Sequence, residues 1–143
     1  MKRILFIICC LAAYQCHAQK FILLDTHISE PPFYADRITT ADKLKGYFPV
    51  EKKDLPDFIK ILEDISRQLS AKNNSDAKQY HLGCISFNGL TFRLSSGKSL
   101  DYVLTSVCEH VKIVMHLCDG KIGNADNAYF VNTWIKYIKA AIR

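Results

Sequence analysis

The sequence predicts an α+β domain in which a small, mainly antiparallel sheet, built on a central β-hairpin, packs against about three helices. Three observations predict this fold. Alternating side chains flank Asn88-Gly89, helical periodicity runs through residues 54–69, and two later stretches, beginning near residues 100 and 124, repeat apolar residues at helical spacing. The predicted order is strand, loop, helix, hairpin, helix, helix, without internal repeats or an interdomain linker.

The central hairpin is predicted for Gln79–Ser96, where two alternating runs meet at Asn88-Gly89. This dipeptide favours the positive φ angles of a type I′ turn, and a two-residue loop fixes the register of the strands it joins. Pairing Phe87 with Leu90 then gathers apolar side chains on one face. Because an isolated hairpin is only marginally stable in water, we expect helices to cover that face.

The helices are predicted from apolar spacing and from their end signals. Asp54 is a good N-cap, and Pro56 is tolerated in a first turn, so a helix is expected to begin there. A second helix is predicted over residues 100–118 and should end at Gly120, although its β-branched residues would also suit strands. A last helix should start near Asn124 or Asp126. The apolar stripe of the first helix is Phe58, Ile61, Leu62, Ile65 and Leu69.

Two short extended segments lie before the first helix. Lys20–Leu24 is apolar and β-branched, and Tyr47–Val50 contains Pro49, which confines it to a sheet edge or an isolated segment. Residues 26–34 between them are expected to form an irregular loop. The aromatic residues of these segments are our candidates for partner binding, and the alternative is that they fold over the core as a lid. These candidates are Phe33, Tyr34, Tyr47 and Phe48.

The first residues are typical of a secretory signal peptide. Lys2 and Arg3 precede the apolar run Ile4–Ala13, and cleavage is expected near Ala18. The run is shorter than the roughly 20 residues that span a bilayer, so we expect no stable membrane anchor. The sequence therefore predicts a signal peptide over residues 1–18 and a single exported α+β domain over residues 19–143, in the bacterial periplasm or secreted.

The charge distribution argues against nucleic acid as a partner. The formal net charge is +5 for the whole chain and +3 once Lys2 and Arg3 leave with the signal peptide. Basic and acidic residues are interspersed along the mature chain, and its longest basic run is Lys52-Lys53. This pattern is typical of a solvated surface and not of the clustered basic footprint of a nucleic-acid-binding protein.

Three cysteines, an odd number, remain in the mature chain: Cys84, Cys108 and Cys118. In the helix predicted over residues 100–118, the last two would lie about 15 Å apart, too far for a disulfide. A disulfide would therefore join Cys84 with Cys118 or Cys108. The alternative is that all three are buried thiols that pack as small apolar residues.

Motifs for catalysis or metal binding are absent from the sequence. It has no His-Glu-x-x-His, Cys-x-x-Cys, acidic calcium loop, Gly-x-Ser-x-Gly or glycine-rich phosphate loop. We therefore expect no catalytic residue, no metal and no cofactor. The alternative is a hydrolase that uses Cys84, His81 or His110, although residues 81 and 84 would face opposite sides of one strand.

In its size, its address and its lack of a catalytic motif, the chain resembles periplasmic immunity proteins that block toxins, and inhibitors of hydrolases. No residue motif of such a family is matched. The resemblance implies a non-enzymatic protein-binding domain whose partner is a toxin or a hydrolase. The alternatives are a small secreted hydrolase or toxin and a subunit of an envelope complex.

Overall fold

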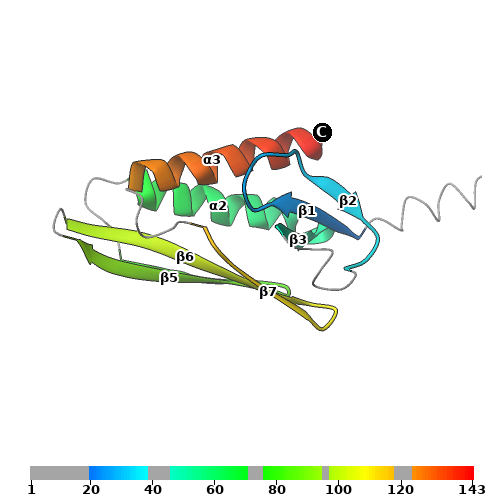
Figure 1. Ribbon diagram of the computed structural model, residues 1–143, viewed down its shortest axis with the longest axis horizontal. Coiled ribbons are helices and arrows are strands. Elements are labelled where there is room, and N and C mark those ends of the chain that lie inside the picture. The colour runs from blue at the N-terminus through cyan, green and yellow to red at the C-terminus, as the bar shows by residue number, and fades with distance from the viewer. Residues whose placement is uncertain (1–19, 39–45, 71–75, 95–96, 118–123) are drawn as a thin grey trace, which may run out of the picture.

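The computed structural model describes residues 20–38, 46–70, 76–94, 97–117 and 124–143. The predicted signal peptide, residues 1–18, and Cys118 lie outside this described part. The described chain forms two antiparallel sheets and two long helices, which confirms the α+β class (Figure 1).

The smaller sheet has three strands: β1 (Phe21–Asp25), β2 (Phe33–Ala35) and β3 (Tyr47–Glu51). Their order is β2-β1-β3, so β3 is an edge strand, as Pro49 requires because proline has no N–H to donate to a second neighbour. Every residue of β1 is buried, so this central strand is covered on both faces. Both predicted extended segments are confirmed, and β2 adds a short strand where an irregular loop was expected.

The two long helices are α2 (Leu55–Ser70) and α3 (Asn124–Ala141), and a 3₁₀ turn, η1 (Lys52–Asp54), precedes α2. Both helices match the sequence prediction. The apolar stripe of α2 is largely buried, and each fully buried large side chain stabilises the fold by about 1.5–3 kcal/mol.

The larger sheet has four strands in the order β4-β5-β6-β7, all antiparallel. The two helices lie side by side along one face of this sheet (Figure 1). The strands are β4 (Gln79–Leu82), β5 (Ile85–Leu94), β6 (Gly97–Cys108) and β7 (Val111–His116).

Trp134 of α3 is the centre of the main core, which joins both sheets to both helices. Its ring lies 6.2 Å from Phe48 of β3 and 6.2 Å from Phe58 of α2, and Phe58 lies 5.5 Å from Phe87 of β5. The indole Nε1–H donates to the backbone oxygen of Asp25 at 3.0 Å, which satisfies a polar group that would be costly to bury unpaired.

The hairpin expected at Asn88-Gly89 is wrong, because β5 runs straight through both residues and pairs Gly89 with Tyr102 of β6. Glycine is needed at position 89 because the backbone of Lys78 approaches it closely, and not because the chain turns there. Its N–H donates to the oxygen of Lys78 at 3.0 Å, and a Cβ at position 89 would lie 2.5 Å from that oxygen. A side chain there would collide with the chain that leads into β4.

The helix expected over residues 100–118 is also wrong, so the described chain has two long helices and not about three. This stretch forms β6 and β7, joined by a two-residue turn in which Glu109 and His110 have φ of 50° and 66°. Positive φ at both positions is the mark of a type I′ turn. Every second residue from Leu100 to Cys108 is buried, so the apolar residues also satisfy a period of two.

Candidate functional site

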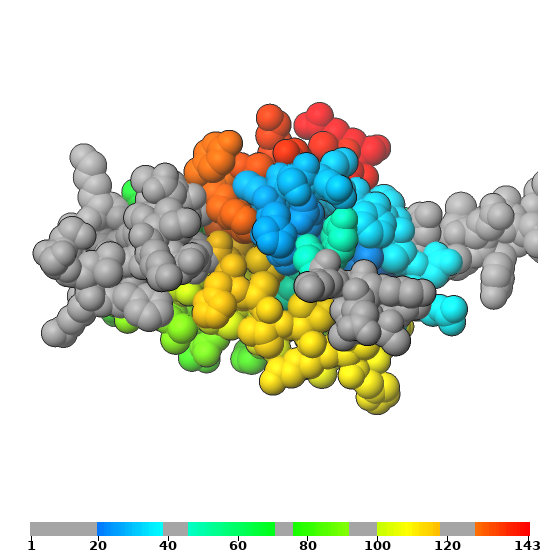
Figure 2. Space-filling view, viewed as in Figure 1, coloured from blue at the N-terminus to red at the C-terminus, as the bar shows by residue number. Residues whose placement is uncertain are grey.

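The candidate site is the outer face of the four-stranded sheet, opposite α2 and α3. Figure 1 shows the helices on one side of the sheet, and no element of the described chain covers the other side. In Figure 2, β6 and β7 (yellow) reach the lower surface of the molecule, away from α3 (orange to red). We call this surface the open face. Its described side chains are Gln79, His81, Ser86, Asn88, Leu90, Asp101, Val103, Thr105, Val107, Lys112, Val114 and His116.

A row of four residues in register crosses the open face, one from each strand: His81, Ser86, Thr105 and Val114. Two hollows of about 330 Å³ adjoin this row, and both are lined by its first three residues. The row thus offers an imidazole, two hydroxyl groups and an aliphatic side chain to a contacting molecule. Such a mixture suits a protein surface, because it combines hydrogen-bonding groups with apolar area.

The aliphatic residues of the open face are unusually accessible. Val107 is 54% exposed, Val114 is 52% exposed and Leu90 is 37% exposed. A strand that faces water on one side normally alternates apolar residues inside with polar residues outside. Valine at the outward positions therefore breaks the pattern expected of a solvated sheet face.

The ionisable groups exposed on the open face, within the described residues, are Lys112 and the two histidines His81 and His116. Asp101 also points to this side, but it is only 2% exposed and its Oδ2 lies 2.9 Å from Nδ1 of His116. The accessible charge of this surface is therefore neutral to basic.

The four aromatic candidates for partner binding have different environments. Phe33 is 44% exposed and packs edge-on against Tyr47, with ring centroids 5.1 Å apart. Tyr34 is half-buried, and its hydroxyl donates to the oxygen of Ala141 at 3.0 Å. Phe48 is fully buried in the core, so it is not accessible to a partner. Phe33 is therefore the exposed one of the four, and Tyr47, which packs against it, is half-buried like Tyr34.

A polar network that the sequence analysis missed ties α2 to the sheet. Tyr102 donates to Oε1 of Gln68, whose amide donates to Tyr80 at 2.6 Å, and Tyr80 donates to Asp64. The hydrogen bond from Tyr80 lowers the pKa of the Asp64 carboxyl, while burial and that carboxylate raise the pKa of Tyr80. Both tyrosines stay protonated and donate, so the network is structural. It joins residues far apart in sequence, and no local pattern reveals it.

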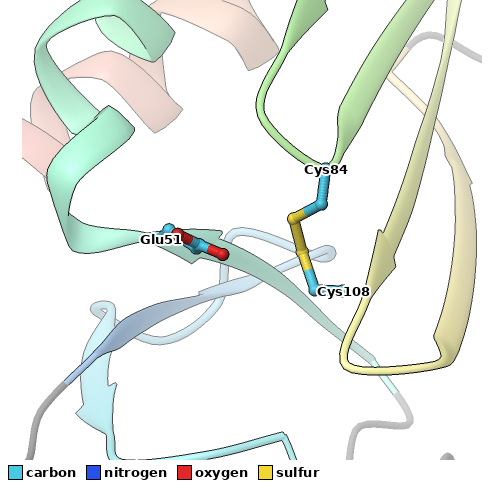
Figure 3. A group of neighbouring side chains, drawn as sticks. All are labelled: Glu51, Cys84 and Cys108. Atoms are coloured by element: carbon cyan, nitrogen blue, oxygen red, sulfur yellow. A yellow bond between two sulfur atoms is a disulfide. The ribbon is translucent and has the colours of Figure 1, made fainter.

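Cys84 and Cys108 form a disulfide, with Cα atoms 5.4 Å apart, which links the β4–β5 loop to the end of β6 (Figure 3). Cys108 ends a strand and does not lie in the helix expected over residues 100–118. One carboxylate oxygen of Glu51, at the end of β3, lies within 4.8 Å of both sulfur atoms. This cluster of three side chains comes from three separate elements.

The residues considered for a hydrolase do not form a catalytic set. Cys84 is in the disulfide and has no free thiolate to act as a nucleophile. His81 lies on the open face, and His110 lies in the β6–β7 turn. No hydrogen bond described in the structure joins either histidine to a carboxylate or to Cys84.

Comparison of the chain with protein-family models, with curated proteins and with solved structures gives no match. Within the described residues, neither helix combines the length and apolar character that crossing a membrane requires.

Proposed function

We propose that this chain is an exported, non-enzymatic protein-binding domain, of the kind that acts as an immunity protein or inhibitor, and that its contact surface is the open face. The observation that carries this proposal is the set of accessible aliphatic side chains on that face, with Val107 and Val114 each more than half exposed. Accessible apolar area on an otherwise packed fold is typical of a surface that a partner covers.

The size of the open face is compatible with a specific complex. Its strands have 4, 10, 12 and 6 residues. At about 3.3 Å per residue and about 4.8 Å between strands, these cover roughly 500 Å² in projection, before the relief of the side chains is added. A standard interface buries about 800 Å² on each partner. The open face would supply more than half of it.

Export is supported by the disulfide between Cys84 and Cys108, because such bonds persist in oxidising compartments and are rare in the cytosol. The signal peptide predicted from residues 1–18 leads to the same compartment. A binding role, as opposed to turnover, is supported by the state of Cys84, the strongest nucleophile candidate, whose sulfur is already bonded.

The proposal is tested by co-expression of the chain with the toxin or hydrolase encoded beside its gene. We expect co-expression to restore growth and to give a complex that survives purification. Val107→Arg and Val114→Arg should each abolish protection, since a long cation replaces a half-exposed aliphatic contact. Tyr129→Arg, at a 69% exposed position of α3, is the matched control and should protect fully.

Circular dichroism of the three variants separates loss of binding from loss of fold. Protection by both valine variants at the wild-type level would remove the open face as the contact surface. Failure of the wild-type chain to protect or to bind the adjacent gene product would remove the immunity function itself.

A further inference from the structure

We infer that reduction of the disulfide between Cys84 and Cys108 converts the cluster with Glu51 into a binding site for a thiophilic divalent cation such as Zn²⁺. The disulfide and the metal are then two mutually exclusive states of the same three side chains. This inference does not depend on the proposed function, because it concerns a different part of the molecule.

The positions of the ligand atoms carry the inference. The two sulfurs and a carboxylate oxygen of Glu51 all lie within 4.8 Å of one another (Figure 3). Tetrahedral Zn²⁺ binds thiolates at about 2.3 Å, so two thiolates on one ion stand about 3.8 Å apart. With Cα atoms 5.4 Å apart, Cys84 and Cys108 reach that spacing by rotation of their side chains.

The surroundings of the cluster favour the thiolate form of its two cysteines once the disulfide is reduced. Two thiolates and the Glu51 carboxylate carry three negative charges, one more than a divalent ion neutralises. The ammonium groups of Lys53 and Lys20 lie 2.9 Å and 4.0 Å from the Glu51 carboxylate, and their two positive charges more than neutralise this single excess charge. The Glu51 side chain is only 15% exposed, so these charges are poorly screened by water.

Asp54 is a second carboxylate near the cluster, because it lies against Gly83, the residue before Cys84. One carboxylate oxygen of Asp54 is buried without a hydrogen-bond partner among the described residues, and it lies against Gly83. An unpaired buried acceptor costs about 1–3 kcal/mol, and a cation held nearby would reduce that cost. Asp54 is outside the ligand set, and its role here is electrostatic.

A dithiol reduces the disulfide by transferring two electrons and two protons to it, and the dithiol itself becomes a disulfide. A phosphine supplies two electrons, and one water molecule supplies both the two thiol protons and the oxygen of the resulting phosphine oxide. The divalent cation then displaces the two thiol protons and binds both thiolates. Glu51 is the third protein ligand, and water takes the fourth position of an open tetrahedral site.

The inference is tested with Co²⁺ as a spectroscopic probe on the full chain. After reduction with a phosphine and its anaerobic removal, one equivalent of Co²⁺ should produce a thiolate-to-cobalt charge-transfer band, which Zn²⁺ should remove. The oxidised chain should give no band. Cys84→Ser and Cys108→Ser should each abolish it.

Glu51→Gln is the variant that tests the complete ligand set. It should weaken Co²⁺ binding at least about tenfold, since loss of an outer-shell partner alone costs 10–100-fold. Glu109→Gln is the matched control, because Glu109 also contacts Lys20, at 3.3 Å, but lies outside the cluster. Thermal unfolding of both oxidised variants checks the fold. Absence of the band in the reduced chain, or wild-type affinity in Glu51→Gln, overturns the inference.

Discussion

Gly89→Ala should lower the free energy of unfolding by about 1–2 kcal/mol, although alanine is the better residue for an ordinary strand position. The added Cβ would lie 2.5 Å from the backbone oxygen of Lys78 and 3.0 Å from its nitrogen. That backbone is held by hydrogen bonds to Gly89 and to the hydroxyl of Tyr102, so it cannot give way cheaply. Overpacking of this kind costs about 1–3 kcal/mol, and the lower entropy of an unfolded alanine chain returns about 0.5–1 kcal/mol.

Asn88→Ala is the control that separates the strand from the turn predicted by the sequence. In β5, Asn88 is exposed and its φ is not positive, so its replacement should change stability by less than about 0.5 kcal/mol. In a type I′ turn both residues would need positive φ, and alanine would be unfavourable at each position by about 1–2 kcal/mol.

Urea unfolding followed by circular dichroism, with the disulfide intact, measures both changes. A Gly89→Ala variant with the same free energy of unfolding as the wild type would refute the close approach of Lys78 to Gly89. Equal destabilisation by both substitutions would instead favour the turn.

Three further changes test the fold. Replacing Cys84 and Cys108 together by serine should lower the free energy of unfolding by about 3.5 kcal/mol, because the disulfide no longer closes a loop of 24 residues in the unfolded chain. An unchanged midpoint of urea unfolding would contradict the disulfide. Burial would raise the pKa of Asp25, but hydrogen bonds from Ser29 and from neighbouring backbone N–H groups lower it from 3.8 to about 2. Since the folded pKa is the lower one, the carboxylate contributes about 1–2 kcal/mol of stability that is complete above about pH 5 and is lost as the pH falls through 2. An acid titration of Asp25→Asn should lack this loss, and the same loss in the variant would exclude Asp25 as its source. Tyr102→Phe should lower the free energy of unfolding by about 1–3 kcal/mol, because the side-chain oxygen of Gln68 and the backbone N–H of Lys78 both lose their hydrogen bond to the hydroxyl. A melting temperature equal to that of the wild type would show that the network is dispensable.

The elements that could be predicted from the sequence are those with one unambiguous signal. For α2, helical spacing over four turns agrees with an Asp-Leu-Pro start at residue 54, and both point to the same element. Pro49 correctly indicates that β3 lies at an edge. For both elements the local sequence disfavours the alternative secondary structure, so tertiary contacts do not change the outcome.

The segment from residue 100 to 118 could not be predicted because its apolar residues satisfy two periods at once. Leu100, Leu104 and Val107 fit a helical stripe, while alternate residues from Leu100 to Cys108 fit a strand. Pairing of β6 along the full length of β5 decides between them, and that long-range contact has no local signal. The turn at Asn88-Gly89 was wrongly predicted for a related reason, because glycine also occurs within a strand where another chain segment approaches closely.

Neither proposed site could be found from spacing along the chain. The open face is defined by which side of the sheet the helices cover, and outward valines such as Val114 look like core residues in the sequence. The cysteine cluster combines the end of β3, the β4–β5 loop and the end of β6. Its three members are separated by more than 20 residues each, so no ligand-spacing motif describes them.

The central claim, that the open face binds a protein partner, is tested most directly by the affinity of the purified partner for matched variants in calorimetry. We predict that Val114→Arg weakens binding by at least about 2 kcal/mol, or about 30-fold, as expected when a contact residue of an interface is replaced by a long cation, and that Tyr129→Arg binds like the wild type. Equal affinity of the partner for the wild type and for Val114→Arg would contradict the claim.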